Sequence, residues 1–479
     1  MKLQASETAR AVRGSMVGPD VEVDGATIDS REAGGGRLFV PVRARRDGHD
    51  FIADALAAGA AAYLTSAPPR GGTAIVVDDT VAALGAAGAA ARHLLPDRVV
   101  GITGSVGKTS TKDLLAAALA RRWRTAASAR SFNNELGVPL TLLNAPSDSE
   151  AVVVEMGARG EGHVAALCAV ARPTVGVVTT VGKAHTEQFG TVERVARSKS
   201  ELVRSLPADG VAVLNAEVGL VAAMAAVAPG MVLTFGLAAG DVRAAGVRLD
   251  PELRGRFRLL SPWGEADVVL GVRGEHQVAN ALAAAAAALA CGMVPEEVAE
   301  GLATAELSPW RMELSRSPAG ALVLNDSYNA NPVSTAAALR SLARLDVPRR
   351  TAVLGVMAEL GPDAAEEHRR MGALAVELGI RVIAVAAPDY GGEPVDDVDG
   401  ALAALGPVGE GDAVLVKASR AAGLEHLADR LVSQHGAGPT FGEEAGLGPR
   451  RESEHGAGWG RGPTFGEEAG LGPRRESEH

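Results

Sequence analysis

A glycine-rich segment in the first third of the chain carries residue types that bind phosphate. It reads Gly-Ser-Val-Gly-Lys-Thr over residues 104–109 and follows a short β-branched run at 98–104. Glycines let backbone N–H groups turn toward phosphate oxygens, and the start of a following helix adds positive partial charge. This pattern predicts a variant P-loop, shorter than the standard spacing, with a lysine for the outer phosphates and a threonine hydroxyl for Mg²⁺. The predicted contacts to a nucleotide are Gly104, Ser105, Val106, Gly107, Lys108, Thr109 and Ser110.

Three more residues have side chains that could take part in the chemistry, and the carboxylate among them could hold a metal. Glu155 ends the apolar run at 151–155, where open α/β sheets place their ligands. His185 follows the next apolar run, and Lys199 comes 14 residues later in a segment that we expect to be helical. Each also has an ordinary interpretation, as a solvent-facing acid, a loop histidine or a lysine on a helix surface.

The use of lysine adds weight to the chemical interpretation of some of these residues. The chain has 47 basic residues, and only six are lysine. They are Lys2, Lys108, Lys112, Lys183, Lys199 and Lys417. Arginine is not deprotonated in proteins and binds phosphate as a planar fork rather than as a point charge. Where lysine persists, we therefore expect its own chemistry to be required.

The elements that would position these residues alternate between strand-like and helical runs. Apolar strand-like runs occur at 151–157, 174–182, 210–216 and 231–236, and helical stretches separate them. A third region repeats the pattern with runs at 321–328, 351–357, 381–386 and 413–419. Such alternation predicts an α/β protein with mostly parallel sheets covered on both faces. The predicted domains are 1–98, 99–312 and 313–433.

The last part of the chain has a different composition. From residue 434 it is rich in Gly, Glu, Arg, Pro and Ser, and an 18-residue sequence at 438–455 recurs unchanged at 462–479. Two copies are too few for a stacked repeat fold, and a segment with so few aliphatic residues cannot offset its ordering entropy. We predict a disordered tail over 434–479 without a function.

Composition excludes several classes of partner. Hydrophobic residues make up 47% of the chain but aromatic residues only 3%, so the core must be aliphatic. The net charge of −11 argues against a nucleic-acid partner and against an anionic membrane surface. Cys168 and Cys291 lie far apart in the chain and lack metal-ligand spacing. Two isolated thiols of this kind are typical of a protein in a reducing compartment. The first residues contain no apolar signal segment, and the longest apolar run, near 281–294, is shorter than the roughly 18 residues that a membrane span needs. We expect a cytoplasmic protein without membrane insertion.

Several motifs, in order and over about residues 20–430, resemble those of the Mur ligases. DSYNANP and the LG-x-M-x-ELG pattern are the most specific of them. Besides the phosphate loop, the motifs are NNELGVPLTLL (133–143), EMGARGEGH (155–163), GKAHTEQFG (182–190), SKSEL (198–202), GEHQVANALAA (274–284), DSYNANP (326–332), LGVMAELG (354–361) and VKASR (416–420). The resemblance implies three domains, with a central P-loop ATPase domain and a Rossmann-like C-terminal domain.

The resemblance also implies an activity. Among the Mur ligases, the best match is to the member that joins D-alanyl-D-alanine to UDP-N-acetylmuramoyl-tripeptide. ATP would activate the tripeptide as an acyl phosphate, with two Mg²⁺ sites, and the enzyme would act as a monomer in making a peptidoglycan precursor. Two alternatives stay open at this point. One is another amino-acid-adding ligase of the same fold, such as folylpolyglutamate synthase, and the other is a nucleotide-gated binding protein without ligase activity.

Family roles carry over to residues that match the motifs. The catalytic set would be Lys108, Lys199, His185 and Glu155. The metal ligands would be Thr109, Glu155, His185 and a carbamylated Lys199. Other nucleotide contacts would be His276, Asn280, Arg311 and Asp326. The uridine-nucleotide site would use Asp29, Ser30, Arg31, Asp47 and His49. The muramoyl-peptide would meet Asn133 and Asn134, and the dipeptide would meet Tyr328, Asn329 and Asn331.

Four positions depart from the family pattern. Thr180 and Gln277 each stand where asparagine is usual, and Glu217 stands where aspartate is usual. Val356 replaces an aspartate and so removes a carboxylate. These changes affect the nucleotide site and the third domain, whereas the phosphate and metal residues are all present.

Overall fold

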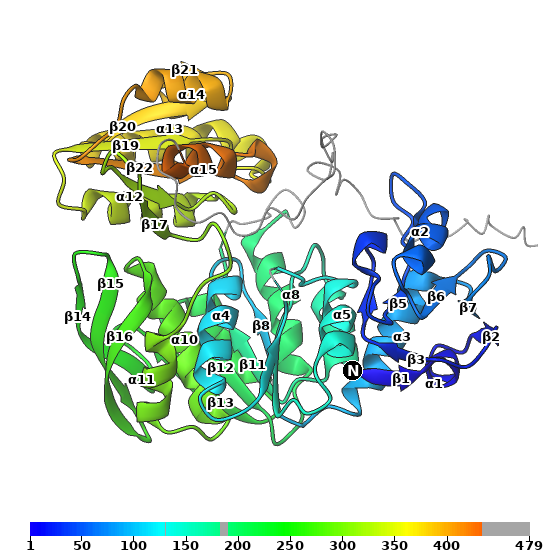
Figure 1. Ribbon diagram of the computed structural model, residues 1–479. Coiled ribbons are helices and arrows are strands. Elements are labelled where there is room, and N and C mark those ends of the chain that lie inside the picture. Colours follow the sequence, from blue (N-terminus) through cyan, green and yellow to red (C-terminus); the bar gives the residue numbers. More distant parts are fainter. Residues whose placement is uncertain (130, 183–189, 434–479) are drawn as a thin grey trace, which may run out of the picture. The chain divides into compact units, whose positions relative to one another are not determined.

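The computed structural model describes residues 1–129, 131–182 and 190–433. Four β-sheets form in this part of the chain, and Figure 1 colours them along the sequence from blue to orange. Strands alternate with helices over most of this part of the chain, so the predicted α/β class is confirmed. None of the described helices has both the length and the apolar character needed to cross a membrane.

The first region contains a five-stranded sheet and a two-stranded one. In spatial order the larger sheet consists of β2 (Ser15–Val17), β7 (Thr73–Val76), β6 (Ala62–Thr65), β5 (Leu38–Phe39) and β4 (Ala26–Thr27). Its strands are parallel except for β2. The small sheet pairs β1 (Lys2–Gln4) with β3 (Glu22–Asp24), and the helices are α1 (Ala5–Ala11), α2 (Ile52–Ala57) and α3 (Thr80–Arg92). The parallel strands end at one edge, which gathers the loops that follow them.

The central region is built on a nine-stranded sheet. Its spatial order is β16 (Gly264–Arg273), β15 (Arg254–Ser261), β14 (Val242–Leu249), β13 (Met231–Gly236), β12 (Val211–Asn215), β11 (Val175–Val178), β8 (Val99–Thr103), β10 (Ala151–Glu155) and β9 (Thr125–Ala127). The neighbouring strands from β9 to β14 are parallel, in line with the predicted mostly parallel sheet, although β9 and β14 themselves were not predicted. The antiparallel strands β15 and β16 were not predicted. In β15 buried and exposed residues alternate, which is typical of a strand with one wet face and gives a weaker signal than a continuous apolar run.

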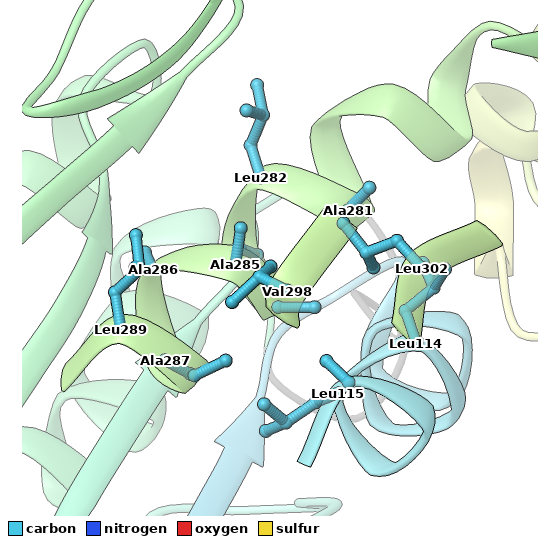
Figure 2. Close-up of a cluster of buried hydrophobic side chains, with 14 of the residues drawn as sticks. Leu114, Leu115, Ala281, Leu282, Ala285, Ala286, Ala287, Leu289, Val298 and Leu302 are labelled. Atoms are coloured by element: carbon cyan, nitrogen blue, oxygen red, sulfur yellow. The ribbon is translucent and has the colours of Figure 1, made fainter. Parts of the chain in front are cut away.

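Helices cover both faces of the parallel part of this sheet. Val153 packs with α4 (Lys108–Leu119), α10 (His276–Ala290) and α11 (Pro295–Ala303). Its neighbours Val152 and Val154 point the other way, toward α5 (Gly137–Asn144), α6 (His163–Ala171) and α8 (Val192–Arg204). Alternate residues of a strand face opposite sides of a sheet, so one strand serves two cores. Figure 2 shows the first core, in which leucines of α4 meet alanines of α10 and aliphatic residues of α11.

The last region has a six-stranded sheet between two pairs of helices. The spatial order is β17 (Glu313–Arg316), β18 (Leu322–Asn325), β22 (Asp412–Lys417), β19 (Arg349–Leu354), β20 (Arg381–Val385) and β21 (Glu393–Val395). Only β17 is antiparallel to its neighbour. One core involves α12 (Pro332–Ala343) and α13 (Ala364–Glu377), and the other involves α14 (Val398–Leu405) and α15 (Glu425–Ser433).

Candidate active site

The predicted phosphate loop joins β8 to α4. Gly104 and Gly107 have φ angles of +154° and +87°, which residues with a Cβ rarely adopt. A Cβ at Gly104 would collide with the Thr179 hydroxyl, and one at Gly107 would collide with the side-chain amide of Asn280. Both glycines are therefore required, by conformation and by space.

Two threonines that follow β11 hold the loop in place. Ser105 N donates to the Thr180 carbonyl at 2.9 Å, and Val106 N donates to Thr180 Oγ1 at 3.0 Å. Thr179 Oγ1 donates to the Val106 carbonyl at 2.6 Å. Thr180, which departs from the family pattern, thus binds the loop through its hydroxyl.

Lys108 begins α4 and points back into the loop. Its ammonium group donates to the Gly104 carbonyl at 2.8 Å. Burial lowers the pKa of Lys108, and the negative charge of Glu155 partly opposes this shift. Phosphate oxygens arriving beside this lysine would favour its charged form.

Glu155 ends β10, as predicted, and its side chain is buried. Oε1 accepts a hydrogen bond from Asn133 Nδ2 at 2.8 Å, and the backbone N–H donates to Ser128 Oγ at 3.2 Å. Oε2 is also buried but has no partner among the described residues. A buried carboxylate oxygen without a partner calls for an explanation, and a bound cation supplies one.

Lys199 lies on α8 and is 3% exposed. Its burial, and then the positive charge of Lys108, lower the pKa of Lys199 well below its ordinary value. The surface interpretation of this lysine is therefore wrong. His185, predicted beside it, lies outside the described residues.

Thr109 meets Arg311 and a serine that sequence reasoning missed. Thr109 Oγ1 lies 3.2 Å from Ser131 Oγ, and Arg311 Nη2 donates to both oxygens, at 3.0 Å and 3.4 Å. The Arg311 guanidinium also stacks over the ring of Tyr328 at 4.1 Å. The only sequence signal for Ser131 was a hydroxyl two residues before Asn133.

The first turn of α10 adjoins the phosphate loop. Asn280 Nδ2 donates to Gln277 Oε1 at 2.8 Å, and Gln277 Nε2 lies 3.1 Å from His276 Nε2. Burial lowers the pKa of His276, so the ring is neutral at pH 7. Its Nδ1 is buried and has no partner among the described residues. Gln277, the second family departure, links the two residues predicted to lie beside adenine.

Asp326 holds the chain that enters the last region. Oδ2 forms an ion pair with Lys417 Nζ at 2.5 Å, and Oδ1 accepts a hydrogen bond from Met312 N at 3.2 Å. Lys417 also donates to the Asn329 carbonyl at 3.0 Å. Asn329 Oδ1 accepts from Ala330 N at 2.9 Å.

Asn331 is the N-cap of α12, and Asn134 is hydrogen-bonded to the first turn of α5. Asn331 Oδ1 accepts a hydrogen bond from Ser334 N at 2.9 Å at the start of α12. Asn134 Oδ1 accepts from Gly137 N at 2.9 Å at the start of α5. These two side-chain oxygens therefore serve local structure.

The residues predicted to bind a uridine nucleotide follow neighbouring parallel strands. Asp29 follows β4, caps the short helix η1 (Ser30–Glu32) and pairs with Arg31 Nη2 at 2.6 Å. Asp47, in the chain that follows β5, caps η2 (Gly48–Phe51) and contacts His49 Nδ1 at 2.6 Å. Hydrogen bonds from His49 lower the pKa of Asp47. Strands β4 and β5 are adjacent, so both segments follow the same edge of the sheet.

The two remaining residues that depart from the family pattern, Glu217 and Val356, have different surroundings. Glu217 Oε1 accepts a hydrogen bond from Ala238 N at 2.7 Å and supports the turn after β13. Val356 follows β19 with its side chain partly exposed, and its carbonyl accepts from Ser419 N at 2.9 Å. Only the backbone of Val356 thus forms a hydrogen bond.

No three His, Cys, Asp or Glu side chains gather into a metal-binding group among the described residues. The described groups that fit a cation are instead the Thr109 hydroxyl and the unpartnered Oε2 of Glu155. This arrangement suits Mg²⁺, which prefers oxygen ligands and keeps several waters.

A phosphate loop, a buried carboxylate and a third α/β region define an ATP-dependent ligase of the Mur type. Residues 102–288 match the Mur ligase middle domain, and residues 310–420 match the Mur ligase glutamate ligase domain. The chain belongs to the Mur ligase family. It is 43% identical to the UDP-N-acetylmuramoyl-tripeptide–D-alanyl-D-alanine ligase of Mycobacterium tuberculosis, over 85% of this chain and 91% of that protein.

Two crystal structures are similar to the chain over most of its length. MurF from Acinetobacter baumannii has a TM-score of 0.82 and 31% identity, over 91% of this chain and 99% of that one. MurF from Thermotoga maritima, solved in complex with ADP, has a TM-score of 0.75 and 29% identity, over 86% and 98% of the two chains. The predicted three-domain Mur ligase fold is thereby confirmed.

Proposed function

We propose that this chain is an ATP-dependent ligase that joins D-alanyl-D-alanine to UDP-N-acetylmuramoyl-tripeptide. The product is the UDP-linked pentapeptide used in peptidoglycan synthesis. The observation that carries the proposal is the 43% identity to a ligase of that name over 91% of its length. The phosphate loop supports the proposal together with the buried Glu155, whose Oε2 has no partner among the described residues, because the reaction needs a nucleotide and a cation at one place.

We assign the nucleotide to the phosphate loop and the first turn of α10. The backbone of 104–107, the ammonium of Lys108 and the hydroxyl of Thr109 would face the phosphates, and His276 and Asn280 would face the base. Arg311 would meet the outer phosphates, because its guanidinium already contacts Thr109 at 3.0 Å. Asp326 would position the chain that carries Arg311, because it accepts a hydrogen bond from Met312 N.

We assign Mg²⁺ to Thr109 and Glu155, with a second site that uses His185 and a carbamylated Lys199. Bound Mg²⁺ would neutralise charge that develops on the transferred phosphoryl group. Carbamylation requires a neutral amine, and the burial that lowers the Lys199 pKa provides one. Arginine could not be modified in this way.

The two substrates would approach this centre from opposite regions. Asp29, Ser30, Arg31, Asp47 and His49 would bind the uridine nucleotide, and Asn133 and Asn134 would meet the muramoyl-peptide. Tyr328, Asn329 and Asn331 would meet the dipeptide. We also propose domain boundaries at 98/99, 312/313 and 433/434, and a monomer that acts in the cytoplasm.

The reaction would proceed in two steps. The terminal carboxylate of the tripeptide attacks the γ-phosphorus of ATP, which forms an acyl phosphate and releases ADP. The amine of D-alanyl-D-alanine then attacks the acyl carbon, loses a proton and expels inorganic phosphate. Positioning and charge neutralisation account for most of the catalysis in the first step. Lys108 and Arg311 would supply positive charge. Further donors would be backbone N–H groups of the loop other than those of Ser105 and Val106, which donate to Thr180.

The direct test is phosphate release with ATP, Mg²⁺ and purified UDP-N-acetylmuramoyl-tripeptide, with and without D-alanyl-D-alanine. We expect release that depends on the dipeptide, together with the pentapeptide mass. Release with folate plus glutamate in place of these substrates would instead support the folylpolyglutamate alternative. Binding of ATP without any product would support a binding protein.

A further inference from the structure

The phosphate-loop helix α4 carries a buried ion pair just beyond Thr109. Lys112 Nζ lies 2.8 Å from Asp113 Oδ1, and the two side chains are 3% and 11% exposed. Adjacent residues on a helix do not face one another, so the helix alone does not explain this pairing. Each side chain is held by a partner outside the helix.

Lys112 holds the segment that touches Glu155. Its ammonium donates to the Ser128 carbonyl at 2.8 Å, where the chain leaves β9. The hydroxyl of Ser128 accepts from Glu155 N at 3.2 Å. Five residues later, Asn133 Nδ2 donates to Glu155 Oε1. Lys112 therefore anchors the beginning of a segment that contacts Glu155 twice.

Asp113 holds the linker that carries Arg311. Its Oδ2 accepts a hydrogen bond from Ser308 N at 2.7 Å, and its Oδ1 accepts from Ser308 Oγ at 3.2 Å. Ser308 lies 195 residues away in the chain and three residues before Arg311. Arg311 in turn contacts Thr109, which lies one helical turn before Asp113.

We infer that Lys112 and Asp113 are positioning residues for the ligase reaction. The pair fixes Ser128, where the chain leaves β9, and Ser308, in the chain that carries Arg311, to the same helix that presents Lys108 and Thr109. The inference rests on the proposed function, and it identifies Asp113 as acting through Arg311. It also explains why lysine occurs at 112. A compact ammonium reaches both Asp113 and Ser128, whereas the planar guanidinium of an arginine would need more room.

The test uses conservative variants, because removal of one partner leaves a buried charge unpaired and destabilises the fold. Asp113→Asn keeps the size of the side chain, and Lys112→Arg keeps the charge. The matched control is Glu300→Gln, since Glu300 pairs with Arg121 just beyond the far end of α4 at 2.7 Å but is 62% exposed. Ser308→Ala, which removes only one donor, serves if the others fold poorly.

Steady-state turnover of the full chain should fall with each of the two variants. The assay is run at a temperature well below the melting transition of each variant. We expect kcat to drop about tenfold or more in Asp113→Asn and in Lys112→Arg, because small misplacements at a reacting centre are costly. Glu300→Gln should keep kcat within about twofold. A lowered melting temperature with unchanged kcat in both variants would mean a purely structural role and overturn the inference.

A double-mutant cycle tests whether Asp113 acts through Arg311. In an Arg311→Ala background, adding Asp113→Asn should lower kcat by less than about twofold further. If Asp113→Asn lowered kcat equally in the wild-type and Arg311→Ala backgrounds, Asp113 would not act through Arg311. The cycle is repeated on the Kd of a non-hydrolysable ATP analogue, so it gives a result even if the wild-type chain makes no pentapeptide. Absence of product in the wild type would count against the proposed function alone.

Discussion

The hydroxyl of Thr180 is hydrogen-bonded to both backbone groups of Val106. It accepts from Val106 N at 3.0 Å and lies 3.2 Å from the Val106 carbonyl, to which it donates. Val106 occupies the middle of the phosphate loop, between two glycines with positive φ. The loop is thus fixed from a strand end that lies 74 residues further along the chain.

We expect Thr180→Val to weaken ATP binding. The substitution keeps the shape of the side chain but leaves Val106 N without this acceptor, which costs about 1–2 kcal/mol and corresponds to roughly a tenfold higher KM for ATP. Calorimetric titration with ADP would check the same loss without turnover. Thr174→Val is the control, because its hydroxyl donates to the Asp97 carbonyl away from the loop. Equal affinities in wild type and Thr180→Val would show that the hydroxyl does not support the nucleotide site.

Lys108→Ala should abolish turnover and leave the fold intact. The outer phosphates would lose a charge-assisted interaction, and we expect a cost of at least about 3 kcal/mol, or about a hundredfold in rate. Circular dichroism and kcat measured on the same sample would separate folding from catalysis. The control Lys2→Ala removes an exposed lysine whose ammonium pairs with Glu22. Near-wild-type activity of a folded Lys108→Ala protein would refute the phosphate assignment.

The buried His276 should make the protein sensitive to mild acid. Burial lowers its pKa in the folded state, whereas the unfolded chain has the ordinary value of about 6.5. As the pH falls below about 6.5, the unfolded state binds the proton first, so the stabilising contribution of the neutral ring is lost down to the folded pKa. It is fully present above about 6.5.

The measurement is the fall in melting temperature between about pH 7.5 and pH 5.5, the range that brackets the ordinary histidine pKa. The melting temperature of the wild type should fall more than that of His276→Gln. The corresponding difference in the free energy of unfolding should not exceed about 1.4 kcal/mol per pH unit. His426→Gln is the control, because its side chain is 74% exposed, and it should behave like the wild type. A parallel fall in wild type and His276→Gln would mean that other groups cause the acid sensitivity.

Local patterns in the sequence identified the phosphate loop, the strand that ends at Glu155 and the helix that carries Lys199. Each depends on residues that are close in the chain, where periodicity and glycine spacing constrain structure directly. The contacts that complete the site are non-local. Arg311 reaches Thr109 across 202 residues, and no spacing rule relates such positions.

The strands β15 and β16 and the roles of Ser128 and Asp113 were missed for related reasons. An alternating strand has few apolar residues in a row, and half of its side chains resemble those of a loop or a helix surface. Ser128 and Asp113 gain their roles only through partners that tertiary folding brings near, such as Lys112 and Ser308. Their residue types alone indicate a turn and a helix surface.

The duplicated segment beyond residue 433 should be dispensable. Its prediction as a tail without function rests on composition and on the exact repeat of 438–455 at 462–479. These residues lie outside the described part of the chain. A chain that ends at residue 433 should match the full chain in melting temperature and in kcat/KM, because it retains all four sheets. A clear drop in either quantity would show that the segment supports the rest of the protein.

The last prediction concerns Lys199, which the structure buries beside the charge of Lys108. If Lys199 is carbamylated, it carries a negative charge and helps to bind the second Mg²⁺ with His185. Lys199→Ala should then fold but be nearly inactive. Acetate or formate should partly restore the rate by occupying the vacated anion site. Mass spectrometry of the native protein under CO₂ should show an added carbamate that Lys199→Ala lacks.

Lys199→Arg separates this role from that of an ordinary buried cation. Arginine keeps a positive charge where the carbamate would be negative, so the variant should be as inactive as Lys199→Ala, and short carboxylates should not rescue it as well. The matched control is Arg204→Lys, an exposed basic residue at the end of the same helix, which should change kcat by less than about twofold. Full activity in Lys199→Arg would mean that Lys199 is not the carbamate, and the second Mg²⁺ site would then have to be withdrawn.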